Sequence, residues 1–240
     1  MALQRDSAVI ARGLSKTYGV GSTEVHALSE ATFEIPQGEF VVLLGPSGSG
    51  KTTLLNLIGA LESPTSGDVE VLGVALSGLG ERQRTEYRLR TIGFVFQFFN
   101  LVPTLTAAEN VALLAELTGP DADRRTADVL GQLGLGDRLD HFPAELSGGE
   151  QQRVSIARGL VKGAPLLLCD EPTGALDIET GIRVLEALEA ATTAFGRTVI
   201  VVTHNAVIAK MAHRVIRLQD GKVVSAEVNA GRVPPRELVW

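Results

Sequence analysis

The chain is 240 residues long, 45% of its residues are hydrophobic, and its formal net charge is −6. This length and composition permit a substantial buried core and exclude an intrinsically disordered protein. No apolar run approaches the ~20 residues of a membrane-spanning helix. The acidic net charge argues against a surface that coats nucleic acid, so no nucleic-acid partner is expected.

The cysteine content and the first residues argue against a disulfide-bonded, zinc-binding or secreted protein. The single cysteine, Cys169, excludes an intrachain disulfide and a cysteine-based zinc site. Because it lies in a leucine-rich run, we expect it to be a small buried side chain. Arg5 and Asp6 stand where a secretory leader would be apolar, so no signal peptide is expected.

Residues 7–44 alternate short apolar segments with turn residues, a pattern typical of antiparallel strands and hairpins. A loop tip is expected at 19–22, and Pro36-Gln37-Gly38 turns the chain into the apolar run 40–44. A further strand is expected at 68–72, after the turn residues that precede it. The N-terminal part therefore predicts an antiparallel β subdomain.

Residues 45–52 have the sequence GPSGSGKT and lie between the apolar run 40–44 and a helical pattern at 54–58. Glycines let backbone N–H groups surround phosphate oxygens, Lys51 brings a positive charge to the β and γ phosphates, and the Thr52 hydroxyl is suited to Mg²⁺. A glycine-rich turn without a ligand is the weaker alternative, because strand, loop and helix follow in the required order. The predicted nucleotide contacts here are Gly45, Pro46, Ser47, Gly48, Ser49, Gly50, Lys51, Thr52 and Thr53.

Helical spacing with glycine breaks dominates residues 104–162. Two continuous apolar runs follow, at 166–169 and 199–202, with a helical pattern at 180–188 between them. Strand, helix and strand of this kind are typical of a parallel sheet covered on both faces. The sequence therefore predicts an α/β fold.

Chemically active residues follow the ends of these strands. Parallel sheets bind ligands beyond the carboxyl ends of their strands, so the phosphate loop, Asp170 and His204 are expected to meet at one sheet edge. Asp170 is suited to help hold Mg²⁺, and Glu171 to polarise an attacking water. Adjacent acids can also be solvated or cap the next helix, but the phosphate loop favours the catalytic interpretation.

A second phosphate-binding element is expected at residues 146–153, LSGGEQQR. Ser147 and Glu150 form a helix-capping pair, but a cap does not need Gly148 and Gly149, which lower helix propensity and leave amides free for an anion. The chain thus has two such elements and one complete loop with its acids. Pairing of two copies about a two-fold axis would resolve this count, with Ser147 and Gly149 facing the other chain's nucleotide.

The C-terminal part is expected to contain a hairpin over 216–224 with Asp220-Gly221 as its turn. Pro234-Pro235 suggests a loosely held tail.

Taken together, these motifs resemble the ATP-binding subunits of ATP-binding cassette (ABC) transporters over nearly the whole chain. Residues 45–52 are similar to the Walker A motif of that family, 146–153 to its signature motif and 166–171 to its Walker B strand with the catalytic acid. The remaining matches are Tyr18, similar to the aromatic residue that stacks on adenine, Gln97 of the Q-loop, Gly174 to Asp177 of the D-loop, and His204 as the switch histidine.

The resemblance implies a P-loop NTPase core with a parallel sheet, an N-terminal antiparallel β subdomain and an inserted helical subdomain. The expected single domain, 1–240, divides into a core at 7–97 and 163–225, a helical part at 98–162 and a loose tail at 226–240. The implied reaction is ATP hydrolysis to ADP and phosphate in an ATP-bound homodimer. Catalytic roles are implied for Glu171, His204 and Gln97, Mg²⁺ contacts for Thr52, Gln97 and Asp170, and nucleotide contact for Asp177.

Within the family, residues 94–101 and 170–174 resemble subunits that serve lipoprotein release, macrolide-type efflux and cell-division-type permeases. This implies an integral membrane permease partner with a large extracytoplasmic domain, and a peripheral position on the cytoplasmic face of the membrane. Asn205 departs from the aspartate usual after the histidine.

Two other functions compete with a transporter ATPase. A soluble ABC ATPase acting on ribosomes or DNA would carry two cassettes or long coiled coils, and this chain has one cassette without a heptad insertion. An ATP-binding regulator that never hydrolyses is opposed by Glu171 and His204.

Overall fold

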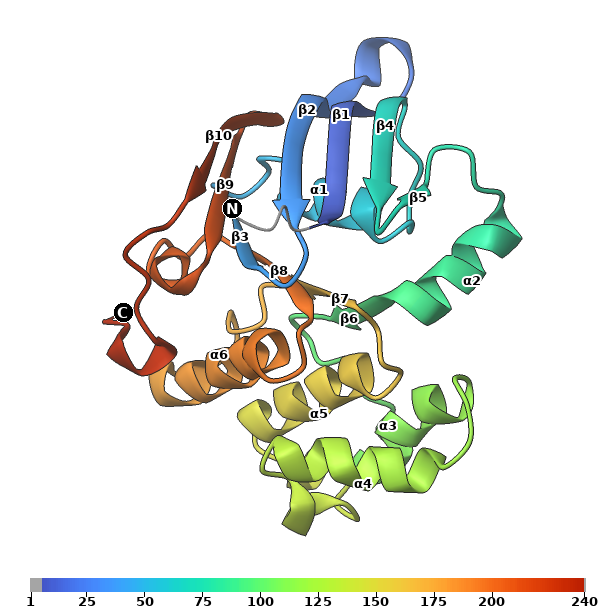
Figure 1. The fold of residues 1–240 in the computed structure, drawn as a ribbon, viewed down its shortest axis with the longest axis vertical. Coiled ribbons are helices and arrows are strands. Elements are labelled where there is room, and N and C mark those ends of the chain that lie inside the picture. Colours follow the sequence, from blue (N-terminus) through green and yellow to red (C-terminus); the bar gives the residue numbers. More distant parts are fainter. Residues whose placement is uncertain (1–5, 240) are drawn as a thin grey trace.

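Two β-sheets organise residues 6–239, the part of the chain that the computed structural model describes (Figure 1). One sheet has four strands in the order β2-β1-β4-β5, and the other has six in the order β10-β9-β3-β8-β7-β6. The strands are β1 (Ser7–Tyr18), β2 (Val25–Pro36), β3 (Phe40–Leu44), β4 (Ser66–Val71), β5 (Val74–Ala75), β6 (Ile92–Val95), β7 (Leu166–Asp170), β8 (Thr198–Thr203), β9 (Arg214–Gln219) and β10 (Lys222–Val228).

Helices cover the six-stranded sheet and form a separate layer at the lower end of Figure 1. The α-helices are α1 (Lys51–Ile58), α2 (Glu81–Thr91), α3 (Ala107–Glu116), α4 (Ala122–Gln132), α5 (Gly148–Leu160) and α6 (Ile178–Thr193). Short 3₁₀ turns are η1 (Gly21–Thr23), η2 (Gly136–Arg138), η3 (Pro143–Glu145), η4 (Ile208–Met211) and η5 (Pro235–Glu237). Among the described residues, no helix combines the length and apolar character needed to cross a membrane.

The larger sheet is built on parallel pairing at its centre. β3 runs parallel to β8 and β9, and β7 runs parallel to β8 and β6. Every residue of β3 and β8 is buried, as expected where both faces of a sheet are covered. The predicted α/β fold with a parallel sheet is confirmed, and the Asp220-Gly221 turn joins β9 to the antiparallel edge strand β10.

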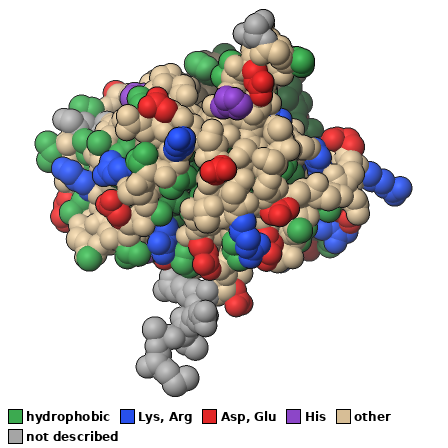
Figure 2. All heavy atoms as spheres, turned by 90° about the horizontal axis from the view of Figure 1, so that it is seen from above, with side chains coloured by type: hydrophobic (Ala, Val, Ile, Leu, Met, Phe, Trp, Pro, Cys, Tyr) green, Lys and Arg blue, Asp and Glu red, His purple; other side chains and the backbone are tan. Residues whose placement is uncertain are grey.

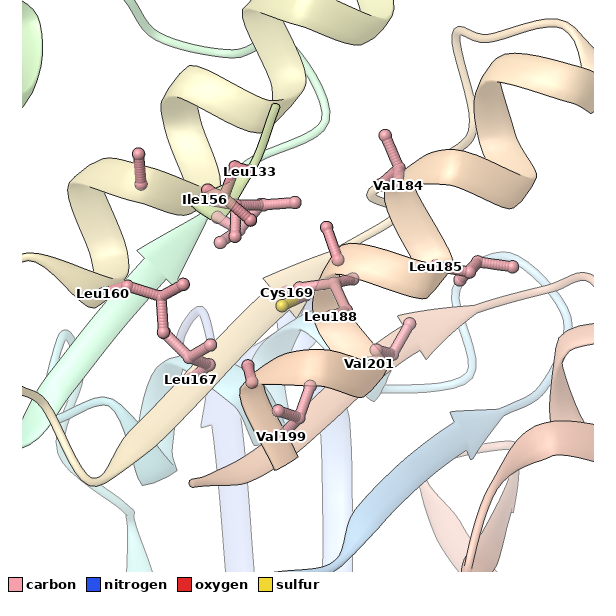
Figure 3. Packing of buried hydrophobic residues seen from close by; sticks show 14 of the residues in the cluster. Leu133, Ile156, Leu160, Leu167, Cys169, Val184, Leu185, Leu188, Val199 and Val201 are labelled. Atoms are coloured by element: carbon pink, nitrogen blue, oxygen red, sulfur yellow. The ribbon is translucent and has the colours of Figure 1, made fainter. Parts of the chain in front are cut away.

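Side chains of the central strands alternate between two cores because neighbouring residues of a strand point to opposite faces. Leu167 and Cys169 of β7 and Val199 and Val201 of β8 face helices α5 and α6, where they meet Leu188 (Figure 3). The alternate residues of these strands pack with α1 and the four-stranded sheet. Cys169 is fully buried in the first core, which confirms its predicted role as a small packing residue.

The N-terminal strands are longer than the sequence pattern suggests. β1 and β2 each run for 12 residues and pair antiparallel, with register shifts between Ala11 and Lys16. Turn-like residues inside them, such as Gly13 and Glu30, take positive φ angles and form irregularities in a continuous ladder instead of ending a strand. The expectation of several short strands is corrected accordingly.

Helix α2 was not expected from the sequence. Eleven residues long and rich in arginine and glutamate, it buries only Tyr87 among its residues. The Tyr87 hydroxyl donates a hydrogen bond to the Ile58 carbonyl at 3.0 Å, which ties α2 to the end of α1. A helix with one buried side chain shows no apolar period for sequence analysis to detect.

Acidic and basic side chains are intermixed on the face above the four-stranded sheet (Figure 2). The whole sequence has 28 acidic and 22 basic residues, so neither charge is scarce.

The C-terminal segment contradicts the predicted loose tail. Arg232 donates a hydrogen bond to the Met211 carbonyl at 2.8 Å and forms an ion pair with Glu189 of α6 at 3.0 Å. Leu238 is 5% exposed and joins the core beneath α6. Pro235, taken as a mark of a loose tail, is buried and begins turn η5.

We expect Leu238→Ala to lower the free energy of unfolding by about 2 kcal/mol, because a buried leucine leaves a cavity when truncated. Val239→Ala is the matched control: Val239 is 80% exposed, so its effect should stay within about 0.5 kcal/mol. Urea unfolding of both variants checks this. Equal effects of the two substitutions would support the prediction of a loosely held tail.

Candidate nucleotide site

A cleft of about 760 Å³ lies at the carboxyl ends of β3, β7 and β8. It brings together the phosphate loop, both strand-end acids and the histidine, as the sequence predicts. Its lining residues are Ala27, Pro46, Ser47, Gly48, Gly50, Lys51, Thr52, Thr53, Gln97, Asp170, Glu171, Val202 and His204. Ala27 and Val202 are additions that the motifs did not indicate.

The loop between β3 and α1 requires glycine at defined points. A Cβ on Gly45 would lie 2.2 Å from the Leu218 carbonyl oxygen, and one on Gly50 would lie 2.4 Å from the Ala27 carbonyl oxygen. Gly50 also has a φ of 95°, which side chains rarely adopt. The loop therefore follows its path only with glycine at these positions, and α1 begins directly after it with its first amides directed toward the loop.

Lys51 is nearly buried at the base of the cleft. Its Nζ donates a hydrogen bond to the Pro46 carbonyl at 2.7 Å. Burial lowers the pKa of Lys51, and the neighbouring charges of Glu171 and Asp170 act in the opposite direction. An ammonium group that has lost water here is suited to bind an anion such as a phosphate.

Thr52 and Asp170 form a pair suited to a divalent cation. The Thr52 hydroxyl lies 3.4 Å from both carboxylate oxygens of Asp170. Burial and then the charge of Glu171 raise the pKa of Asp170, so its negative charge is incompletely compensated. Adjacent hydroxyl and carboxylate oxygens, with the Gln97 amide on the same cleft, fit Mg²⁺, which takes few protein ligands beside phosphate and water.

Glu171 is held by the last residue of β8 and the residue that follows it. Its Oε1 accepts a hydrogen bond from the His204 backbone N–H at 3.1 Å and lies 2.8 Å from His204 Nδ1. Its Oε2 accepts from the Thr203 hydroxyl at 3.2 Å. The backbone at Glu171 has a φ of 44°, which turns the chain sharply at the end of β7. The acid and the histidine are thus direct neighbours.

Asn205 organises the turn that carries the histidine. Its N–H donates to the Thr203 hydroxyl at 3.0 Å, and its side-chain oxygen accepts from the Val207 N–H at 2.9 Å. The amide oxygen supplies the acceptor that a carboxylate would supply at this position. His204 is therefore positioned without an aspartate.

The second predicted phosphate-binding element lies away from the cleft. Ser147 caps α5, with the Glu150 N–H donating to its hydroxyl at 3.3 Å and Glu150 accepting from the Ser147 N–H at 2.8 Å. A Cβ on Gly149 would lie 2.0 Å from Thr180 Cγ2, so glycine lets α5 approach α6 closely. Asp177 caps α6 by accepting from the Thr180 N–H at 3.0 Å. Ser147, Gly149 and Asp177 therefore do not line the cleft of their own chain.

Tyr18, at the end of β1, also lies outside the lining of the cleft. Its hydroxyl donates to Glu62 at 2.6 Å, and the Lys16 ammonium lies 5.0 Å from its ring centroid. Burial favours the protonated form of Glu62, but hydrogen bonds from Tyr18, Asn56 and Lys16 outweigh it and hold the pKa of Glu62 below its ordinary value. No motif includes Glu62, and the helical pattern at 54–58 contains Asn56 without indicating this contact.

Comparison with known proteins decides the family. The family model described as ABC transporter matches residues 28–174. The chain belongs to the ABC transporter family. It is 47% identical to an uncharacterized ABC transporter ATP-binding protein of Mycobacterium tuberculosis, over 93% of this chain and 92% of that protein.

Two further relatives add structural and functional detail. The dimeric ATP-binding cassette MJ0796, bound to ADP and Pi, has 41% sequence identity, with a TM-score of 0.84 over 93% of this chain and 99% of that chain. The macrolide export ATP-binding/permease protein MacB of Brucella melitensis is 48% identical over 88% of this chain, but this chain covers only 33% of MacB. The predicted ABC transporter ATPase and its cassette fold are confirmed, and the comparisons favour it over a soluble ABC ATPase of ribosomes or DNA.

We expect Asp170→Asn to raise the melting temperature of the ligand-free protein at pH 7. A carboxyl whose folded pKa is raised destabilises the fold above that pKa, and the penalty disappears as pH falls below the unfolded value of about 3.9. The gain should therefore shrink as the pH approaches 4.

Calorimetry in EDTA measures the melting temperature of the ligand-free proteins. Calorimetry in Mg-ADP measures how much stability each protein gains from the ligand. The wild-type protein should gain more stability from Mg-ADP than the variant, because only the wild type keeps the carboxylate. A variant that is less stable than wild type at pH 7 without ligand would contradict the raised pKa.

Proposed function

We propose that this chain hydrolyses ATP in a homodimer that closes around two Mg-ATP molecules and drives a membrane permease. The observation that carries the proposal is the division of the predicted site. Lys51, Asp170, Glu171 and His204 converge on one cleft, whereas Ser147 lies outside it. A complete site then needs the Ser147 element of a second copy.

Within the cleft, the loop amides and Lys51 would bind the β and γ phosphates. Thr52, Asp170 and Gln97 would hold Mg²⁺, which would neutralise part of the negative charge of the phosphates. Glu171 would accept a proton from the attacking water. The water oxygen would then bond to the γ phosphorus while the bond between the γ phosphorus and ADP breaks. His204 would contact the γ phosphate.

The contact between Glu171 and His204 supports these roles. The 2.8 Å separation of Oε1 and Nδ1 places the base beside the group expected at the γ phosphate. Ser147 and Gly149 of the second copy would complete the γ-phosphate contacts, Asp177 would lie at the shared interface, and Tyr18 would stack on adenine. The dimeric MJ0796 cassette bound to ADP and Pi supports this arrangement.

The transport partner is proposed by comparison with MacB, which is described as an ATP-binding/permease protein. This chain matches about one third of the length of MacB. We propose an integral membrane permease with a large extracytoplasmic domain, served from the cytoplasmic face. Efflux, lipoprotein release and mechanical transmission to an extracytoplasmic domain are the candidate outputs.

Glu171→Gln should bind ATP with affinity close to wild type but lower turnover by at least about 100-fold, because general-base assistance contributes ~10²–10⁴ in rate. Lys51→Ala should instead lose ATP affinity. Single-turnover hydrolysis and equilibrium binding separate the two, and turnover of Glu171→Gln within threefold of wild type would remove Glu171 from the mechanism.

The Glu171→Gln protein should form a dimer in saturating Mg-ATP and return to monomer in Mg-ADP. Adding Ser147→Arg should block the dimer, because a guanidinium and its long stem would fill the position proposed for the partner's γ phosphate. Light scattering after size exclusion measures the mass. A dimer that persists in the double variant would exclude this arrangement.

A further inference from the structure

A cluster of polar side chains beside the cleft is not used by the chemistry of phosphate transfer. We call it the Tyr18 cluster, and its members are Lys16 and Tyr18 of β1, Asn56 of α1, and Glu62. Tyr18 and Lys16 lie two positions apart on one strand and therefore on the same face. The cluster joins β1 to the helix that begins at the phosphate loop.

Glu62 is the centre of this cluster. Its Oε2 accepts from the Tyr18 hydroxyl at 2.6 Å and lies 3.3 Å from Lys16 Nζ, while its Oε1 accepts from Asn56 at 2.9 Å. Lys16 also donates to the Ser63 carbonyl at 2.8 Å. The side chains of Lys16 and Glu62 are 16% and 26% exposed, so these contacts lie largely out of solvent. Partly desolvated, charge-assisted hydrogen bonds of this kind define a geometry.

These contacts fix the ring of Tyr18 in one orientation. Lys16 covers one face of the ring, with its ammonium 5.0 Å from the centroid, while Tyr18 as a whole is 38% exposed. The ring also lies beside the cleft, because the Tyr18 hydroxyl contacts the side chain of Thr53, a lining residue of α1. An aromatic ring with one face occupied and its hydroxyl anchored leaves the other face for a planar ligand group.

We infer that Glu62 is a positioning residue for nucleobase binding, which locks the Tyr18 ring at a fixed place relative to the phosphate loop. The inference rests on the proposed nucleotide site and specifies what holds its base end. Asn56 supplies the link, since it lies on the same helix as Lys51 and Thr52. A nucleotide whose phosphates occupy the loop would then meet a ring that is already oriented, and binding would not have to order it.

The test compares ADP with inorganic pyrophosphate, which carries the same diphosphate without base or ribose. Titration calorimetry of the full-length chain with Mg²⁺ gives both affinities. Glu62→Ala and Tyr18→Phe should each weaken ADP binding by about three- to tenfold, since each removes the hydrogen bond between the Tyr18 hydroxyl and Glu62. Pyrophosphate affinity should stay within about twofold of wild type. Glu62→Gln keeps an acceptor oxygen and should restore ADP affinity to within about twofold of wild type.

Three comparisons make the result decisive. The Tyr18→Phe and Glu62→Ala double variant should bind ADP no more weakly than the worse single variant, because both remove the same interaction. Glu70→Ala, in the same sheet but paired with Arg12 at 3.7 Å, should leave ADP affinity unchanged. Lys51→Ala should weaken both ligands, which tests the phosphate site separately.

The inference is overturned if Glu62→Ala binds ADP as wild type does, or if it weakens ADP and pyrophosphate equally. The second result would mean that Glu62 only supports the fold of the loop. Failure of the wild-type protein to bind ADP would instead contradict the proposed nucleotide site. Melting temperatures of all variants show whether each is folded during the titrations.

Discussion

The parallel pairing of β3, β8 and β7 is the constraint on which the rest of the molecule depends. It brings Thr52 within 3.4 Å of Asp170, although 118 positions separate them along the chain. It also sets Glu171 beside His204. These strands are apolar at every central position because helices and a second sheet cover both faces, so the polar groups of the sheet gather beyond its carboxyl edge. The hydrophobic cores thus set the positions of the polar groups in the cleft.

The charged groups at that edge lower the stability of the ligand-free fold. Burial lowers the pKa of Lys51, and burial together with Glu171 raises the pKa of Asp170. A cation and a polyphosphate that bind together would offset both unfavourable charges. The polyphosphate would pair with Lys51, and the cation would pair with Asp170. Sites of function commonly depart from the rules that stabilise the remainder of a protein. The cleft is such a place, and its electrostatics support binding of Mg-ATP as a unit.

Much of this arrangement could be predicted from sequence because it depends on local patterns. The phosphate loop has required glycines, the central strands have continuous apolar runs, and their ends carry the acids and the histidine. Helix α2 escaped prediction because Tyr87 is its one buried residue, and the ordered C-terminal segment because Leu238 and Arg232 act through distant partners. The Tyr18 cluster escaped for a related reason. Its carboxylate, Glu62, lies 44 positions from the tyrosine, and no local pattern joins them.

The close approach of α5 to α6 connects the two halves of the proposed site. Gly149 lies against Thr180, and Thr180 is bound by Asp177, which follows Glu171 after one short turn. Only a few bonded and packed groups therefore separate the acid from the start of α5. In a dimer, the start of α5 would contact the nucleotide of the other copy, while Glu171 acts on the nucleotide of its own. In that dimer the same packed groups of one chain would therefore lie between the two nucleotides.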